Sequence, residues 1–292
     1  MKQEELNALI ELLDDPDEGI FQHVKSKLLE EGLPIIEMLE HAWEFDIDRV
    51  KQSRIENIVH EIQYQHLSNK LEEWVKLGGK NLLTGAMLVC KYQFPDLDEQ
   101  EVKDRIEAIR KDIWLELNEE LTALEKVRVI NHVLFNIHGF SGNKEDYHAP
   151  QNSFINKVLA TKKGNPLSLS LIYIILAEQL DIPIAGVNLP EHFILAYKDD
   201  LGLLPPEGKD QHHGVFFYIN PFSNGTVFGI KEIDAFLKQL NLDKKSSYYE
   251  PCNNVSMVIR MLNNLYHSYL AINKPEKAAD IQKIMKMLIS KN

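Results

Sequence analysis

The residues that could carry out chemistry in this sequence are a histidine, an asparagine and a serine in the second half of the chain. His192 begins an apolar and aromatic run that is typical of a strand, and Asn220 ends the next such run. Ser168 lies in the first turns of an apolar helix that we expect over 167–180. A hydroxyl nucleophile, an imidazole base and a side chain that orients the imidazole are the parts of acyl-transfer catalysis.

The start of that helix is the place where such chemistry would be assembled. Asn165 is a good N-cap residue, and Pro166 is a good first helical residue. Backbone N–H groups at such a helix start suit a carboxylate or a similar anion. Together with Asn152 and Gly164, these residues form our candidate ligand groove, which leads toward the histidine.

Each of these residues is also open to a structural interpretation. Serines inside helices usually bond to the backbone, and a hydroxyl ionises at far higher pH than a thiol, which disfavours Ser168 as a nucleophile. The ring of His192 is equally well explained by hydrogen bonds to Asn220 and a backbone carbonyl. Asn220 precedes Pro221, and Asn-Pro starts turns readily.

Neither sulfur nor metal chemistry has a recognisable motif. Cys90 lies in an apolar stretch and is expected in the core, and Cys252 follows a proline in a loop where we expect a structural role. Their wide separation excludes CxxC spacing, and the adjacent His212 and His213 would point to opposite faces of a strand. The sequence contains no phosphate-binding glycine loop. We therefore expect no metal and no cofactor.

Composition excludes several classes of partner. The 292 residues include 32 Lys and Arg against 44 Asp and Glu, a net charge of −12 that repels nucleic acid and anionic lipid. The most apolar run, 167–177, is shorter than the roughly 20 residues of a membrane span. The N-terminus turns acidic before any apolar stretch develops, which disfavours a secretory signal. A cytoplasmic protein without disulfides is the expectation.

Periodicity predicts three domains in a mostly helical α+β fold. Domain 1–92 is a helical, HEAT-like array that we interpret as a packing scaffold. Domain 93–245 carries helices and then consecutive strands with short connections, so an antiparallel sheet should cover the central helix. Domain 246–292 is a TPR-like helical hairpin. We also expect Asn152 to cap a short helix and a mobile loop over 199–213. The expected elements are helices near 6–13, 20–31, 35–43, 48–66, 68–77, 82–92, 98–115, 122–138, 153–159, 167–180 and 230–240, and strands near 184–187, 192–197, 215–219 and 227–228.

Short motifs in this order resemble one family. They are GFSGN at 139–143, NSFI at 152–155, GNPLSLSL at 164–171, LDIP at 180–183, LPEHF at 189–193 and NPF at 220–222. Over roughly 85–290 the chain closely resembles the SirB-type branch of the transglutaminase-like superfamily. That resemblance implies a papain-like core in which active enzymes place a cysteine at the helix start, a histidine as base, and an Asp or Asn to orient it.

The resemblance also exposes a missing group. The nucleophile position implied by it falls at Asn165 or Pro166, so no thiol is present there. Removing the nucleophile from a catalytic triad lowers the turnover rate by a factor on the order of 10⁶. We therefore expect a catalytically inactive binding or scaffolding module for a protein or peptide partner. Two alternatives remain open: a Ser- or Cys-dependent amide hydrolase or acyltransferase with His192 as base, and a protein whose helical flanks do the work.

Overall fold

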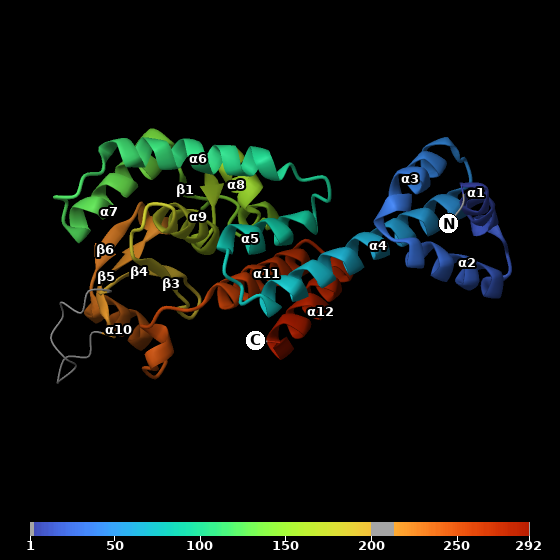
Figure 1. Ribbon diagram of the computed structural model, residues 1–292. Helices are drawn as coiled ribbons and strands as arrows, with labels where there is room; N and C mark the ends of the chain where they lie inside the picture. Colours follow the sequence, from blue (N-terminus) through green and yellow to red (C-terminus); the bar gives the residue numbers. More distant parts are fainter. Residues whose placement is uncertain (1–2, 200–212, 292) are drawn as a thin grey trace. The chain divides into compact units, whose positions relative to one another are not determined.

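The computed structural model describes residues 3–199 and 213–291, and the chain packs as two compact units, 1–73 and 74–292 (Figure 1). The fold is mostly helical with a small antiparallel sheet, which confirms the expected α+β class. His212 and nearly all of the loop expected to be mobile lie outside the described residues, and the division into three domains stays a prediction. Within the described ranges, no helix has both the length and the apolarity to cross a membrane.

The first unit is a small helical array built around a leucine and isoleucine core. Leu13, Leu28, Leu39 and Ile58 are fully buried in it. Asp17 caps the second helix by accepting hydrogen bonds from the backbone at its start. The elements are α1 (Gln3–Glu11), η1 (Leu12–Asp14), α2 (Glu18–Glu31), η2 (Leu33–Ile35), α3 (Ile36–Phe45) and the greater part of α4 (Arg49–Lys76).

Two expected helix boundaries are wrong. The separate helices expected at 48–66 and 68–77 form the single helix α4, because no glycine or proline interrupts the sequence between Arg49 and Lys76. The helix expected at 122–138 is α-helical only as α7 (Ala123–Asn131) and continues as the π-helix η3 (His132–Ile137). His138 N donates to Val133 O, five residues earlier, which widens that turn.

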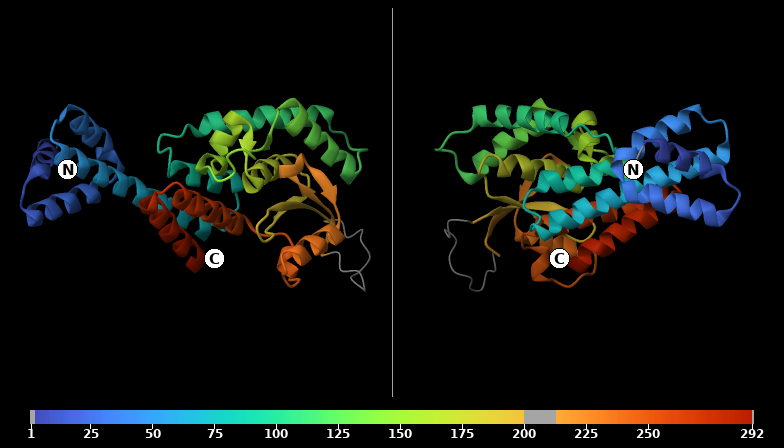
Figure 2. Two further views of the ribbon diagram at one scale, coloured as in Figure 1. Left: turned by 180° about the vertical axis from the view of Figure 1, so that it is seen from behind. Right: turned by 45° about the vertical axis from the view of Figure 1, so that its right-hand side comes forward.

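The second unit places one helix, α9 (Pro166–Glu178), at its centre. Every residue of α9 from Pro166 to Ala177 is buried. The sheet lies on one side of α9 and α6 lies on the other (Figures 1 and 2). A helix that is apolar all round is expected in such a position. The other helices are α5 (Leu82–Lys91), α6 (Glu99–Glu116), η4 (Pro150–Ser153), α8 (Ile155–Thr161), α10 (Ile230–Gln239), η6 (Ser246–Tyr248), α11 (Asn254–Ala271) and α12 (Pro275–Lys291).

The sheet has strand order β3-β4-β5-β6, and every neighbouring pair is antiparallel, as expected from the order of elements. Because side chains alternate across a sheet, one face meets α9 and the other meets α10, where Ile194 and Ala196 pack with Ile233 and Leu237. The strands are β3 (Ile184–Val187), β4 (Ile194–Lys198), β5 (Val215–Asn220) and β6 (Thr226–Phe228), with a separate parallel pair of β1 (Ser141–Gly142) and β2 (Lys163–Gly164).

A polar link crosses this core from α9 to the turn between β5 and β6. The fully buried Tyr173 donates its hydroxyl to Asn131 Oδ1 at 3.1 Å, and Asn131 Nδ2 donates to Gly225 O at 2.8 Å. Gly225 adopts a left-handed φ of 72°, and a Cβ there would overlap the Asn131 side chain. One asparagine thus joins the central helix to the sheet.

We predict that Tyr173→Phe lowers the free energy of unfolding by about 1–3 kcal/mol, because it leaves the Asn131 oxygen without its donor while it preserves ring packing. Tyr266→Phe is the matched control, since its hydroxyl has no hydrogen bond to the described residues; its loss should be about 0.5 kcal/mol or less. Urea denaturation of both variants measures the difference. Equal losses would show that the buried link contributes nothing.

Candidate functional site

The N-terminus of α9 is closed by its own side chains. Asn165 Oδ1 accepts from Ser168 N at 2.8 Å, and Ser168 Oγ accepts from Asn165 N at 3.0 Å, which together make a reciprocal capping box. Pro166 occupies the first helical position, where its missing N–H costs nothing. The predicted cap and helix start are confirmed at these residues.

Hydrogen bonds from neighbouring segments extend this network away from the helix. Asn165 Nδ2 donates to Ser153 Oγ at 3.0 Å. Asn152 accepts from Asn143 Nδ2 at 2.9 Å and donates to the carbonyl oxygens of Asp146 and Tyr147 at 2.6 and 3.1 Å. The expected helix-capping role of Asn152 is therefore wrong: its side chain fastens the preceding loop, and Phe154 is the N-cap residue of α8.

The four residues expected to form the ligand groove share this buried network. Asn152, Gly164, Asn165 and Pro166 are all buried, and the two asparagine side chains bond within the protein. Gly164 is needed for close packing, since a Cβ there would lie 2.7 Å from Ser168 Oγ. These residues build the start of α9 and the network around it. Their contact with a ligand stays a prediction.

Ser168 is placed for capping and not for proton transfer to an imidazole. Its side chain is 1% exposed, and its hydroxyl donates to Asn165 O at 3.3 Å. Ser170 is fully buried and donates to Pro166 O at 2.7 Å. Within the described ranges, neither serine is hydrogen-bonded to His192. Both serines behave as backbone-bonded helix residues.

His192 lies in a tight turn directly before β4 and not inside the strand as expected. Its N–H donates to Leu189 O at 3.2 Å, and Glu191 within this turn has a left-handed φ of 57°. Its ring is tilted against that of Phe236, with 6.3 Å between the centroids. The structure thus gives the histidine one aromatic neighbour and a half-buried position.

Asn220 ends β5 and serves two purposes. Its Oδ1 accepts from Phe222 N at 3.1 Å and Ser223 N at 3.3 Å, which caps the short helix η5 (Pro221–Ser223). The same side chain also hydrogen-bonds to His192. The turn-forming and the histidine-orienting interpretations are therefore compatible in one residue.

The electrostatics of the site favour a neutral imidazole. Burial lowers the pKa of His192 below its ordinary value, the hydrogen bond to Asn220 raises it in part, and the positive charge of Arg260 lowers it again. A neutral imidazole can accept a proton. To act as a general base, it must also lie within hydrogen-bond reach of the group whose proton it removes. In the part of the chain that the structure describes, no serine or cysteine is hydrogen-bonded to the His192 ring.

Arg260 is a site residue that the sequence reasoning missed. It is partly buried on α11, and its Nη1 donates to Asn188 Oδ1 at 3.2 Å. Burial lowers the pKa of its guanidinium, and within the described ranges no carboxylate pairs with it. The composition of its helix could have indicated this residue, because Arg260 is the only charged residue in the 18-residue helix Asn254–Ala271. A partly buried guanidinium whose charge acts on a neutral imidazole suits an anionic group.

The two cysteines are poor nucleophiles. Cys90 is fully buried, as expected for a core residue, and burial raises the pKa of its thiol to about 12. Burial also raises the pKa of Cys252 to about 11. At neutral pH both therefore carry protons, and the reactive thiolate is scarce. Among the described residues, no group of three or more His, Cys, Asp or Glu side chains is arranged to hold a metal ion.

Known proteins are similar in sequence to much of this chain. A UPF0162 protein of Xylella fastidiosa strain 9a5c is 28% identical over 209 residues, which cover 68% of this chain and 68% of that protein. The UPF0162 protein YchA of Escherichia coli K12 is 24% identical over 200 residues, which cover 68% of this chain and 70% of that protein.

A further similarity is to F-box only protein 21 of Mus musculus, which is 32% identical over 136 residues, 47% of this chain and 20% of that protein. No solved structure matches. The sequence model of the transglutaminase-like superfamily matches residues 100–263, more than half of the chain and a span that includes α9, His192, Asn220 and Arg260. The chain therefore belongs to the transglutaminase-like superfamily.

Proposed function

We propose that this protein is a catalytically inactive transglutaminase-like protein of the SirB-type branch that serves as a binding or scaffolding module for a protein or peptide partner. The observation that carries the proposal is the closed start of α9. An active enzyme of this layout presents a thiolate at this helix start. In this chain, Asn165 and Ser168 are hydrogen-bonded to each other there. The chain thus uses the helix terminus for stability.

The absence of a thiol at the start of α9 supports binding over catalysis. Because triad members act as a unit, removal of the nucleophile lowers the turnover rate by a factor on the order of 10⁶. Ser168 is a weak substitute, since its proton is donated to Asn165 O and its side chain is 1% exposed. Cys90 and Cys252 are weak substitutes because burial raises the pKa of each thiol.

The remaining groups of the site support binding of a carboxylate. Arg260 supplies a cation that has no acidic partner in the part of the chain that the structure describes. His192, on whose pKa the charge of Arg260 acts, and its partner Asn220 supply neutral polar groups. A peptide carboxylate accepts hydrogen bonds from a guanidinium in a bidentate manner, which suits this arrangement. The terminal helices α11 and α12, TPR-like in this proposal, hold the arginine in place.

The first prediction for the site concerns covalent labelling. Fluorophosphonate and iodoacetamide probes should give no stoichiometric label that depends on His192 in the full chain, because neither serine nor cysteine is activated there. Mass spectrometry of the native protein, His192→Ala and the exposed control His267→Ala measures this. Stoichiometric labelling of one residue that is lost only in His192→Ala would establish the enzyme instead.

The second prediction concerns the titration of His192. Its pKa should lie below 6.5, the value from which burial lowers it. Arg260→Gln should raise that pKa, because it removes a nearby positive charge, whereas Asn220→Ala should lower it, because it removes a hydrogen bond that favours the imidazolium. NMR titration of the histidine Cε1–H signals follows both variants, with the exposed His267 as internal control. Shifts of the same sign in the two variants would refute this geometry.

A further inference from the structure

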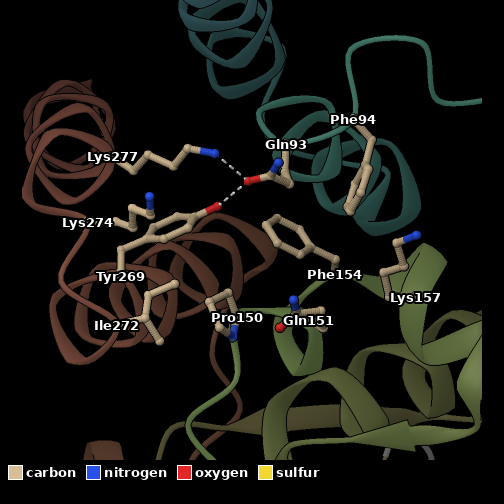
Figure 3. A pocket seen from close by; sticks show the side chains of 10 residues that line it. All are labelled: Gln93, Phe94, Pro150, Gln151, Phe154, Lys157, Tyr269, Ile272, Lys274 and Lys277. Atoms are coloured by element: carbon tan, nitrogen blue, oxygen red, sulfur yellow. Dashed lines mark hydrogen bonds between the residues drawn. The ribbon is translucent and has the colours of Figure 1, made fainter.

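A pocket of about 540 Å³ lies in the second unit, and its lining does not include the residues of the histidine site (Figure 3). Its walls come from the end of α5, the η4 turn, α8, and the hairpin of α11 and α12. Small-molecule sites typically occupy about 300–1,000 Å³. The pocket shares no lining residue with the proposed carboxylate site, so the two can be tested separately.

The charge of the pocket is opposite to that of the chain. The chain carries a net charge of −12, yet the lining contains Lys157, Lys274 and Lys277 and no Asp or Glu. None of the three ammonium groups has a carboxylate within 4 Å among residues 3–199 and 213–291. Unpaired cations gathered in a concave site favour an anionic ligand.

Two of these lysines stand at one end of the pocket. Lys277 Nζ donates to Gln93 Oε1 at 2.8 Å, and the Tyr269 hydroxyl donates to the same oxygen at 3.0 Å (Figure 3). Gln93 therefore holds Lys277 in position and keeps its amide NH₂ as a further donor. Burial lowers the pKa of Lys277, and the charge of Lys274 lowers it further, so an anion between the two would relieve their repulsion.

Apart from Gln151 and Lys157, the remainder of the pocket lining is apolar or aromatic. Ile272 is 49% exposed although it follows directly on α11, and Phe94 lies across the pocket from it (Figure 3). Lys157 Nζ lies 4.6 Å from the centre of the Phe94 ring, a cation–π contact. An exposed aliphatic side chain and an aromatic ring beside a cationic end suit the organic part of an amphiphilic anion.

We propose that this pocket binds a small organic phosphate of about mononucleotide size, with its phosphate between Lys274 and Lys277 and its organic part against Ile272 and Phe94. A phosphate monoester carries a charge of about −1.5 to −2 and three acceptor oxygens, which matches two neighbouring ammonium groups better than a single carboxylate does. A small ligand fits better than a nucleic acid strand, because the acidic chain repels a long polyanion beyond the pocket.

The test uses the full chain and adenosine 5′-monophosphate as the probe, followed by isothermal titration calorimetry. The wild-type protein should bind the probe saturably, and Lys274→Gln/Lys277→Gln should weaken binding at least tenfold. Lys283→Gln/Lys286→Gln, with both residues on α12, makes an equal change in net charge outside the pocket and should leave affinity within about twofold. Equal weakening by both pairs, or no saturable binding to the wild-type protein, would overturn the proposal.

Two further arms separate the phosphate from the organic part. Inorganic phosphate and adenosine should each bind at least tenfold more weakly than the complete probe. Inorganic phosphate lacks the contacts with the apolar wall, and adenosine lacks the contacts with the lysines. Ile272→Ala should weaken the probe several-fold and leave inorganic phosphate unchanged, with circular dichroism as the check on folding. If inorganic phosphate bound as tightly as the probe, the apolar wall would have no role and the assignment of an organic phosphate would be wrong.

Discussion

The start of the buried helix α9 is the constraint on which the rest of the second unit depends. A helix leaves its first backbone N–H groups without partners inside the helix, and a buried terminus cannot leave them to bulk water. The chain meets this demand at Ser168, whose N–H donates to Asn165 Oδ1, and Pro166 at the first helical position has no N–H to satisfy. Ser153 Oγ in turn accepts from the Asn165 side chain, and Asn165, Ser168 and Ser153 are all almost completely buried. The N–H of Ser168, a donor that could otherwise bind an anion or favour a thiolate, therefore already has a partner within the protein.

This network also fixes the segments around the helix. Asn152 ties the loop at 143–147 to the η4 turn, and Gly164 allows strand β2 to pass close to Ser168. On the opposite side, Tyr173 and Asn131 connect α9 to the β5–β6 turn that follows Asn220. The position of Asn220, and through it the hydrogen bond to His192, thus depends on contacts made by the same central helix.

Local signals made the framework predictable. Apolar residues on every side of 167–177 predicted burial, and Asn165-Pro166 predicted the helix start, because both depend on the nearest residues in sequence. The strand order likewise followed from short connections. The continuity of α4 could have been predicted, because no glycine or proline interrupts the sequence between Arg49 and Lys76.

Long-range contacts account for what the sequence did not predict in the site. Asn152 resembled a helix cap by its position, yet its partners Asn143, Asp146 and Tyr147 belong to the preceding loop. Arg260 reaches Asn188 across 72 residues of sequence, so helical periodicity could not reveal the pairing. The three lysines of the pocket come from two separate regions of the chain, and only folding gathers them.

The short turn η4 connects the two regions that carry the proposals. Its first residues, Pro150 and Gln151, line the lysine pocket, and its last, Asn152 and Ser153, belong to the network that closes α9. Four consecutive residues thus contribute to both the lysine pocket and the hydrogen-bond network at the start of α9. Because a one-turn helix has little freedom to deform once both ends are bonded, contacts at Gln151 and the hydrogen bond at Ser153 constrain the same backbone. The hydrogen bonds at the start of α9 therefore also constrain the backbone that forms one wall of the pocket.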